Sequence, residues 1–413
     1  MPKERIIFHV DVNSAFLSWE SVDRLREDPT ALDLRTIPAV IGGDEESRHG
    51  IVLAKSTSAK AHGIVTGEPI AQARKKCPGL TIVPSRFEIY IESSSRLMTL
   101  LDSYSPDIEK FSIDEAFVDM TDTIHLFGTP MEVAAQLRER IHKELGFTVN
   151  IGIAPNKLLA KMASDFQKPD RCHSLWREEI PTKLWPLPIR ELFFVGGSAE
   201  RKMLNIGIRT IGDLAHCDVR ILRSHLGSKY ADLIYNYANG IDEDPVSEKE
   251  PLNKGYGNST TLSRDISDYD TAYQVLLSLS ETVGARLRHD HVVCNCICVE
   301  WKDWEFHVQS HQMTLDSPTD STAAIYQHAC TLLHHAWDLT PVRLLGIRTS
   351  KIREEGFSQM NLFDTKHNQK MEQLEKTVDS IRDKFGVDSI KRASFLQKDV
   401  IVDHAASKHK HLS

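Results

Sequence analysis

The sequence predicts an α+β protein of several domains. With 413 residues, the chain is long enough for two to four domains that each bury a core. Apolar runs of strand length alternate with helical periodicities up to about residue 170, which indicates an α/β or α+β unit. An all-helical pattern follows, and a polar stretch then leads into a second region of strands and helices.

The first unit begins with the apolar run of residues 6–11, which we expect to form a buried strand. Asn13 and Ser14 come next and are suited to cap a helix. The strand and helix patterns that follow are expected at residues 38–41, 51–54, 59–63, 87–104, 131–145 and 148–153.

The second half of the chain changes character twice. Residues 192–240 read as short helices joined by glycine-containing turns, and the polar stretch 242–251 is expected to be a tether between domains. Beyond it, strand-like residues 292–299 and helix-like residues 323–337 predict a second α+β domain that ends near Lys351.

The tail carries one clear amphipathic helix, which Gly386 is suited to end. We expect its apolar face to dock on the body of the protein, with a partner protein as the alternative. The apolar residues recur at spacings of three and four and are Met371, Leu374, Val378, Ile381 and Phe385. Three histidines near the end are too irregularly spaced to indicate a metal site, namely His404, His409 and His411.

The bulk composition is typical of a soluble globular protein. Hydrophobic residues make up 41% of the chain, and no apolar run approaches the length of a membrane span. The N-terminus leads straight into a strand, so no signal peptide is expected. Seven cysteines without paired spacing fit a reducing compartment, and we expect a cytoplasmic protein. The net charge of −8 disfavours nucleic-acid binding unless basic residues gather on one face.

Three carboxylates are the most informative residues. Asp11 closes the first strand, and Asp114 and Glu115 are neighbours in the alternating segment 112–119. Hard divalent cations bind carboxylates that enter a site from separate strands, and such cations neutralise a nucleotide triphosphate and its transition state. The three residues are therefore candidate catalytic residues and metal ligands.

Three blocks of sequence resemble those of one enzyme family. Residues 8–16 and 112–117 resemble the two metal-binding motifs of Y-family (translesion) DNA polymerases, and residues 151–164 resemble their third block. The order and spacing of the blocks match, and the resemblance extends from residue 6 to about residue 363. Within the family, the chain is most similar to the bacterial polymerase IV (DinB-like) branch.

The resemblance implies a right-hand polymerase. We expect a palm of mixed sheet and helices, small fingers, a helical thumb with a helix-hairpin-helix, and an α+β little finger. The implied ranges are 1–33 and 79–172 for the palm, 34–78 for the fingers, 173–242 for the thumb, 243–251 for a linker, 252–352 for the little finger and 353–413 for the tail.

The activity implied by the resemblance is template-directed addition of deoxynucleotides to a primer 3′ end, with low fidelity, in translesion synthesis and DNA repair. Two Mg²⁺ ions per active site are the implied cofactors. Asp11 and Asp114 would bridge the two ions, and Glu115 would complete the ion at the primer hydroxyl. The backbone carbonyl of Val12 would be a further ligand.

Four more residues match nucleotide-binding positions of the family. Phe16 lies at the steric gate, where an aromatic ring beneath the sugar leaves no room for a 2′-hydroxyl. Lys161 matches the lysine that reaches the triphosphate. Thr57 and Lys60 stand where many members carry tyrosine and arginine. Lys60 keeps the positive charge of the arginine but cannot form two parallel hydrogen bonds, and Thr57 keeps the hydroxyl of the tyrosine but has no ring to pack.

DNA contacts are implied in the thumb and the little finger. Gly196 and Gly197 open a helix, and Gly227 and Lys229 lie in a second turn, where backbone N–H groups are expected to bind DNA phosphates. Arg264 is expected on a strand that faces the template backbone.

The predicted little finger is acidic for a domain that grips DNA. Residues 251–350 hold seven basic and eleven acidic residues, so we expect hydroxyl and amide groups to dominate its contacts. Cys294, Cys296 and Cys298 alternate along one predicted strand and would share one face. We expect buried thiols there, with a metal site as the alternative.

The tail also carries a short partner motif. Gln359, Leu362 and Phe363 resemble the Gln-x-x-Leu-Phe peptide that binds the bacterial sliding clamp, where the two apolar residues would fill a pocket and the glutamine would bond its rim. The expected partners are primer–template DNA, deoxynucleoside triphosphates and the sliding clamp. The protein is expected to be a monomer.

Two other functions remain as alternatives. A catalytically silent, polymerase-like scaffold would be recruited to damaged DNA through the clamp, but relatives of that kind lose the acidic residues that this chain keeps. Residues 42–46 come one residue short of the signature of diguanylate cyclases. The apolar residues 38–41 before them match the fingers of the polymerase family instead, and a cyclase would need no template.

Overall fold

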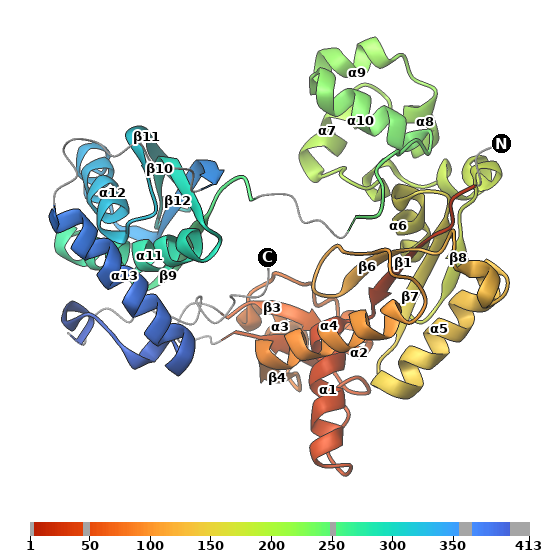
Figure 1. The fold of residues 1–413 in the computed structure, drawn as a ribbon. Helices are drawn as coiled ribbons and strands as arrows, with labels where there is room; N and C mark the ends of the chain where they lie inside the picture. The colour runs from red at the N-terminus through yellow and green to blue at the C-terminus, as the bar shows by residue number, and fades with distance from the viewer. Residues whose placement is uncertain (1–3, 44–49, 248–252, 355–365, 397–413) are drawn as a thin grey trace. The chain divides into compact units, whose positions relative to one another are not determined.

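The computed structural model describes residues 4–43, 50–247, 253–354 and 366–396. Contacts divide the chain into two compact units. One unit comprises residues 1–42 and 52–250, and the other comprises residues 43–51 and 251–413. Figure 1 shows the helices and strands of both units.

A five-stranded sheet forms the centre of the first unit, in the order β5-β6-β1-β7-β8. Its strands are β1 (Ile7–Val12), β5 (Ile108–Lys110), β6 (Glu115–Asp119), β7 (Val149–Ala154) and β8 (Cys172–Ser174). The first strand pairs antiparallel with β6 on one side and with β7 on the other. The strand that carries Asp11 is therefore central, as a fully apolar run predicts.

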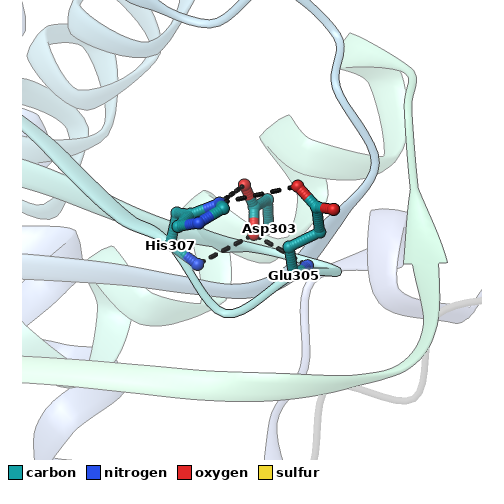
Figure 2. A group of neighbouring side chains, drawn as sticks. All are labelled: Asp303, Glu305 and His307. Carbon is teal, nitrogen blue, oxygen red and sulfur yellow. Dashed lines mark hydrogen bonds and ion pairs between the residues drawn. The ribbon is translucent and has the colours of Figure 1, made fainter.

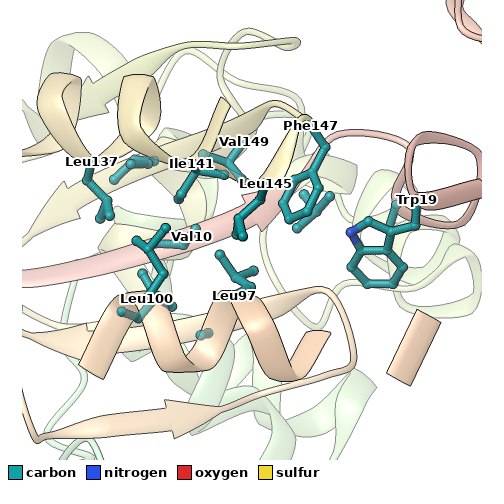
Figure 3. Packing of buried hydrophobic residues seen from close by; sticks show 14 of the residues in the cluster. Val10, Trp19, Leu97, Leu100, Leu137, Ile141, Leu145, Phe147 and Val149 are labelled. Carbon is teal, nitrogen blue, oxygen red and sulfur yellow. The ribbon is translucent and has the colours of Figure 1, made fainter. Parts of the chain in front are cut away.

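Every residue of β1 is buried, because both faces of the sheet are covered. Alternate residues face opposite sides, since Phe8 and Val10 belong to one hydrophobic cluster and Ile7 to another. Figure 3 shows the first side, where residues of α4 (Phe87–Asp102) and α5 (Pro130–Leu145) pack against the sheet. The labelled side chains include Val10, Val149, Leu97, Leu100, Leu137, Ile141 and Leu145. On the second side lies α6 (Lys157–Asp165), and there His9 and Asp11 follow Ile7.

Smaller elements complete the first unit. The helix α1 (Ala15–Glu27) follows β1 directly. A three-stranded sheet in the order β3-β2-β4 consists of β2 (Ala39–Gly42), β3 (Val52–Lys55) and β4 (Thr81–Pro84). The short helices α2 (Thr57–Ala61) and α3 (Ile70–Lys76) share its hydrophobic cluster.

The all-helical prediction for residues 192–240 is confirmed, and the helical turns begin earlier, at Arg177. Three short turns of helix, Arg177–Glu179, Ile180–Leu184 and Ile189–Glu191, come first. They are followed by α7 (Gly197–Asn205), α8 (Ile211–Ala215), α9 (Val219–Leu226) and α10 (Ser228–Ala238). Thr210 and Asp213 form the capping box at the start of α8 that the sequence suggests.

The second unit is built on a four-stranded antiparallel sheet in the order β11-β10-β12-β9. Its strands are β9 (Gly257–Ile266), β10 (Val292–Asp303), β11 (Val308–Thr319) and β12 (Val342–Glu354). The helices α11 (Tyr269–His289) and α12 (Thr322–Ala336) bury one face of this sheet. Among the described helices of the whole chain, none is long and apolar enough to cross a membrane.

The prediction that Cys294, Cys296 and Cys298 share one face of their strand is wrong. The register of β10 shifts between Cys294 and Cys296, so a β-bulge interrupts the alternation. Cys294 lies in the hydrophobic cluster with Ile297 and Val299, whereas Cys296 and Cys298 fall on the opposite face of the sheet. All three thiols are buried, and the described residues hold no metal-ligand group that includes them.

The predicted tail helix is confirmed as α13 (Lys366–Phe385), and it docks on the second unit. Its contacts are mostly ionic. Arg288 of α11 lies 3.3 Å from Glu375 and 2.7 Å from Asp379, and these side chains are largely buried. The apolar face is only partly used, because Leu374 and Phe385 are 53% and 67% exposed.

Candidate active site

The three candidate carboxylates meet at one end of the β1–β6 pair. Asp11 lies opposite Glu115 in the antiparallel register. The Val12 N–H donates to the carbonyl of Asp114 at 3.1 Å, and Ser112 Oγ donates to the Asp114 carboxylate at 2.7 Å. Strand pairing thus brings together residues that lie far apart in the sequence.

Glu115 is held by two groups on the α6 side of the sheet. Lys161 Nζ lies 2.7 Å from Glu115 Oε2, and His9 Nε2 lies 3.5 Å from the same oxygen. Burial alone would raise the pKa of Glu115, but these two neighbours outweigh burial and lower it to about 2. Glu115 is therefore ionised at neutral pH.

Asp11 is buried and has a different partner, Lys168. Burial raises the pKa of Asp11, and the Lys168 ammonium opposes this shift. Lys168 also pairs with Asp165 at 2.7 Å. Each of the two facing carboxylates thus has its own lysine.

A pocket of about 440 Å³ opens over these residues. The walls include side chains from α1, from β3 and α2, and from the loop after α6. The predicted residues that line it are Asp11, Val12, Phe16, Thr57, Lys60, Asp114 and Glu115. The structure therefore brings together seven of the eight residues predicted for metal and nucleotide binding.

Phe16 reaches the pocket from a cluster of aromatic rings. Its ring stacks on Tyr90, with centroids 4.6 Å apart and an angle of 12° between the planes. Phe87 and Trp19 lie at 5.7 and 6.2 Å. Because these rings support it, Phe16 is both a packed residue and a wall of the pocket.

Lys161 is the predicted residue that does not line the pocket. Its side chain is 11% exposed and ends on Glu115. Its contact with a triphosphate stays a prediction.

Sequence reasoning missed Lys168 and Lys55, which both line the pocket. The loop that carries Lys168 is fixed by the side-chain amides of the buried Asn150 and the half-buried Asn13. Asn150 donates to the carbonyls of Ser164 and Gln167 at 2.9 and 2.8 Å, and Asn13 donates to Asn150 at 3.1 Å. The available signal was the Lys-Pro-Asp run of residues 168–170, directly after the third block.

The predicted DNA-binding residues of the first unit lie at exposed helix starts. Gly196 and Gly197 open α7, and Gly227, with φ of 81°, separates α9 from α10, where Lys229 is exposed. The left-handed residue of the turn before α7 is Phe194, with φ of 68° and a ring that is 58% exposed.

In the second unit, Arg264 is exposed on β9. The open face of the sheet also carries a shallow trough of about 570 Å³, whose lining includes Lys254, Asn258 and Arg348. The clamp motif, residues 359–363, lies outside the described residues, as do the three terminal histidines.

The carboxylate site suits hard divalent cations. Its donors are carboxylate oxygens, and two of the carboxylates already bind cations, since Asp11 pairs with Lys168 and Glu115 with Lys161. Among the described residues, the tight group of possible metal ligands is elsewhere, at Asp303, Glu305 and His307 in the turn between β10 and β11 (Figure 2). There Asp303 accepts the backbone N–H groups of Glu305 and His307 at 2.8 and 2.9 Å, so it closes the turn.

Comparison with known sequences and structures bears on this site. Sequence models of the impB/mucB/samB family match residues 10–165, and of its C-terminal domain residues 253–362. A thumb-domain model of DNA polymerase-iota matches residues 191–242. A solved Y-family DNA polymerase chimera, Dbh-Dpo4(243-245)-Dbh, superposes with a TM-score of 0.74 and 25% identity, over 84% of this chain and 99% of that chain.

Curated relatives extend over nearly the whole chain. DNA polymerase IV of Clostridium acetobutylicum is 45% identical over 395 residues, which are 96% of this chain and 99% of the relative. The chain belongs to the Y family of DNA polymerases. DNA polymerase IV 1 of Bacillus subtilis (strain 168) is 37% identical over 402 residues, 96% of this chain and 94% of the relative. The Y-family polymerase is thus a DNA-directed DNA polymerase of the translesion type with the right-hand fold. The predicted fold and the predicted activity are both confirmed.

Proposed function

We propose that Asp11, Asp114 and Glu115 form the catalytic centre for template-directed addition of deoxynucleotides, and that it uses two Mg²⁺ ions. The observation that carries this proposal is the register of β1 and β6, which sets Asp11 opposite Glu115 on the floor of the pocket. These carboxylates and the carbonyl of Val12 would hold the ions. When bound, Mg²⁺ lowers the pKa of the primer hydroxyl and offsets the charge of the leaving pyrophosphate.

The other pocket residues bind and orient the nucleotide. Lys55, Lys60 and Lys168 line the same pocket and supply the positive charge that a triphosphate needs. Thr57 lies on α2 beside Lys60 and offers a hydroxyl to the phosphates. Phe16, fixed against Tyr90, presents a ring at the place of the sugar and excludes a 2′-hydroxyl.

DNA would be held by the thumb and the little finger. The exposed starts of α7 and α10 offer unpaired backbone N–H groups to phosphates. Arg264 and the trough with Arg348 would lie along the template backbone. We keep the predicted domain ranges as part of this proposal, together with a monomeric protein that binds the sliding clamp through Gln359, Leu362 and Phe363.

Primer extension tests the catalytic centre. Wild type and Asp114→Ala are incubated with a short primed template, Mg²⁺ and the four deoxynucleotides, and products are resolved by length. We expect extension by the wild type alone, with equal binding of the primed template by both proteins. Extension by the variant would remove Asp114 from the centre. DNA binding without extension by either protein would favour the scaffold alternative.

Two substitutions test the remaining assignments in the same assay. Phe16→Ala is expected to admit ribonucleotides, and unchanged sugar selection would reduce Phe16 to a packing residue. Replacing Leu362 and Phe363 with alanine is expected to abolish stimulation by a bacterial sliding clamp while basal synthesis stays intact. Stimulation that survives would place clamp binding elsewhere.

A further inference from the structure

The side chain of Lys161 is enclosed on its way to Glu115. Its ammonium lies 2.7 Å from Glu115 Oε2 and 5.3 and 5.4 Å from the ring centroids of Phe111 and Phe193. A buried ammonium is costly unless its charge is compensated, and here a carboxylate and two aromatic rings compensate it. These contacts confine the charge of Lys161 to one place.

That place is on the α6 side of Glu115 and outside the pocket. Lys161 does not line the pocket, whereas Lys55, Lys60 and Lys168 do. The pocket therefore has three other lysines for a triphosphate. Lys161 acts on Glu115, which does line the pocket.

The same helix holds Glu115 by a second route. Ser164 Oγ donates to the carbonyl of Lys161 at 2.8 Å and lies 2.8 Å from His9 Nδ1. The His9 ring is fully buried, and its other nitrogen lies 3.5 Å from Glu115 Oε2. Both contacts to Glu115 thus depend on the position of α6.

One wall of the enclosure belongs to the thumb. Phe193 lies within residues 191–242, which match the thumb-domain model. It contacts Phe111 with centroids 6.1 Å apart, and Tyr237 of α10 with centroids 6.5 Å apart and planes 16° from parallel. A ring of the thumb therefore touches the cation that touches the catalytic carboxylate.

We propose that Lys161 is a positioning residue that holds the Glu115 carboxylate in place for catalysis, and that Phe193 of the thumb supports Lys161. The inference rests on the proposed function, because it takes Glu115 as catalytic. A positioning role affects the maximal rate of nucleotide addition, whereas a nucleotide-binding role affects the nucleotide concentration needed for half of that rate.

The first test separates positioning from triphosphate binding. Lys161→Met keeps the length of the side chain and removes its charge. Lys157→Met is the matched control, because Lys157 lies one turn earlier on α6, pairs with Glu109 at 2.8 Å and lies 5.5 Å from the Phe117 ring centroid. Both variants and the wild type are compared in single-turnover addition of one nucleotide, at saturating DNA and varied nucleotide concentration.

We expect Lys161→Met to lower the maximal rate by about 10- to 100-fold, the usual effect of losing a group that orients a metal-binding side chain. The nucleotide concentration for half-maximal rate is expected to stay the same, and Lys157→Met to behave as wild type. A higher half-saturating concentration with an unchanged maximal rate would make Lys161 a triphosphate ligand. An equal loss of rate in Lys157→Met would reduce the effect to general destabilisation.

The second test needs no activity. Unfolding of the metal-free protein is measured for Lys161→Met, Glu115→Gln and the double variant. Because the two side chains compensate each other's charge, the double variant is expected to recover part of the stability that Lys161→Met loses. Additive losses would show that the pair does not interact, and the inference would fail.

A double-mutant cycle of Phe193 and Lys161 tests whether the thumb supports Lys161. Phe193→Leu is expected to lower the maximal rate by about threefold, and to have no further effect in the Lys161→Met background. An equal threefold loss in that background would show that Phe193 does not act through Lys161. If Glu115→Gln keeps the full rate, the proposed function fails at this residue; if it is inactive while Lys161→Met is not impaired, only the inference fails.

Discussion

The palm sheet and the little-finger sheet place their functional residues in different ways. In the palm, both faces are covered, every residue of β1 is buried, and the proposed catalytic side chains lie at one end of the central strands. In the little finger, α11 and α12 cover one face, while β9 exposes half of its residues and β11 exposes most of its residues. A core on both sides fixes single side chains accurately, whereas an open face offers many contacts of similar strength.

Charge follows the same division. Two palm carboxylates each have a dedicated lysine, Lys168 for Asp11 and Lys161 for Glu115. The little-finger trough has the basic residues Lys254 and Arg348 beside the acidic Glu300, on a domain with more acidic than basic residues. Replacing one charged side chain should therefore reduce function strongly in the palm and only slightly in the little finger.

The largest effect is expected from Asp11→Asn in the palm. The substitution removes a carboxylate charge and leaves Lys168 without its buried partner, which should cost several kcal/mol in the transition state. This corresponds to about a thousandfold loss of rate or more. Single-turnover primer extension measures it, with binding of the primed template as the control. A loss under about tenfold would show that the palm tolerates single changes as the little finger does.

The next effect concerns the stability of the little finger. Arg288→Met leaves Glu375 and Asp379 without their cation, and unpaired buried charges typically cost about 3 kcal/mol. We expect this loss in chemical unfolding of the little finger.

Lys391→Met is the matched control for that substitution, because Lys391 pairs with Asp388 at an exposed site on the same unit. It should cost less than about 1 kcal/mol. Equal effects of the two substitutions would show that the buried ion pairs do not anchor α13. A loss from Arg288→Met alone would show that the little finger concentrates its stability, but not its function, in a few residues.

The smallest effect is expected for Arg348→Ala on the open sheet face. Losing one phosphate contact should weaken binding of the primed template by about two- to fivefold and reduce its salt dependence by about one ion. Arg264→Ala should behave alike, and the two losses should add. Fluorescence anisotropy at several salt concentrations measures both. A loss of about fiftyfold from either substitution would contradict a distributed interface.

The sequence predicts the parts of this protein that depend on local pattern. The apolar run before Asp11, the alternating segment after Asp114 and the three family blocks were enough for the fold and for seven pocket residues. These sequence patterns predict the fold correctly because side-chain alternation determines how the strands pair.

The remaining features depend on contacts between distant segments. Lys168 reaches Asp11 because the amides of Asn13 and Asn150 fix its loop, and the Lys-Pro-Asp run of residues 168–170 does not by itself predict that contact. The bulge after Cys294 moves Cys296 and Cys298 to the opposite face, and no glycine or proline at this place in the sequence predicts it. Ser14 lies at the start of α1 but, with φ of 49°, makes no side-chain cap.

The pairing of β1 with β6 also determines where the chain can change length. Side chains alternate along a strand, so an insertion or deletion of one residue inside either strand would turn Asp11 or Glu115 to the opposite face. An insertion among the exposed residues 28–30 after α1 would leave the pairing intact, because these residues take no part in it. Chains of different lengths can therefore share this chemistry, as long as length changes stay between the strands.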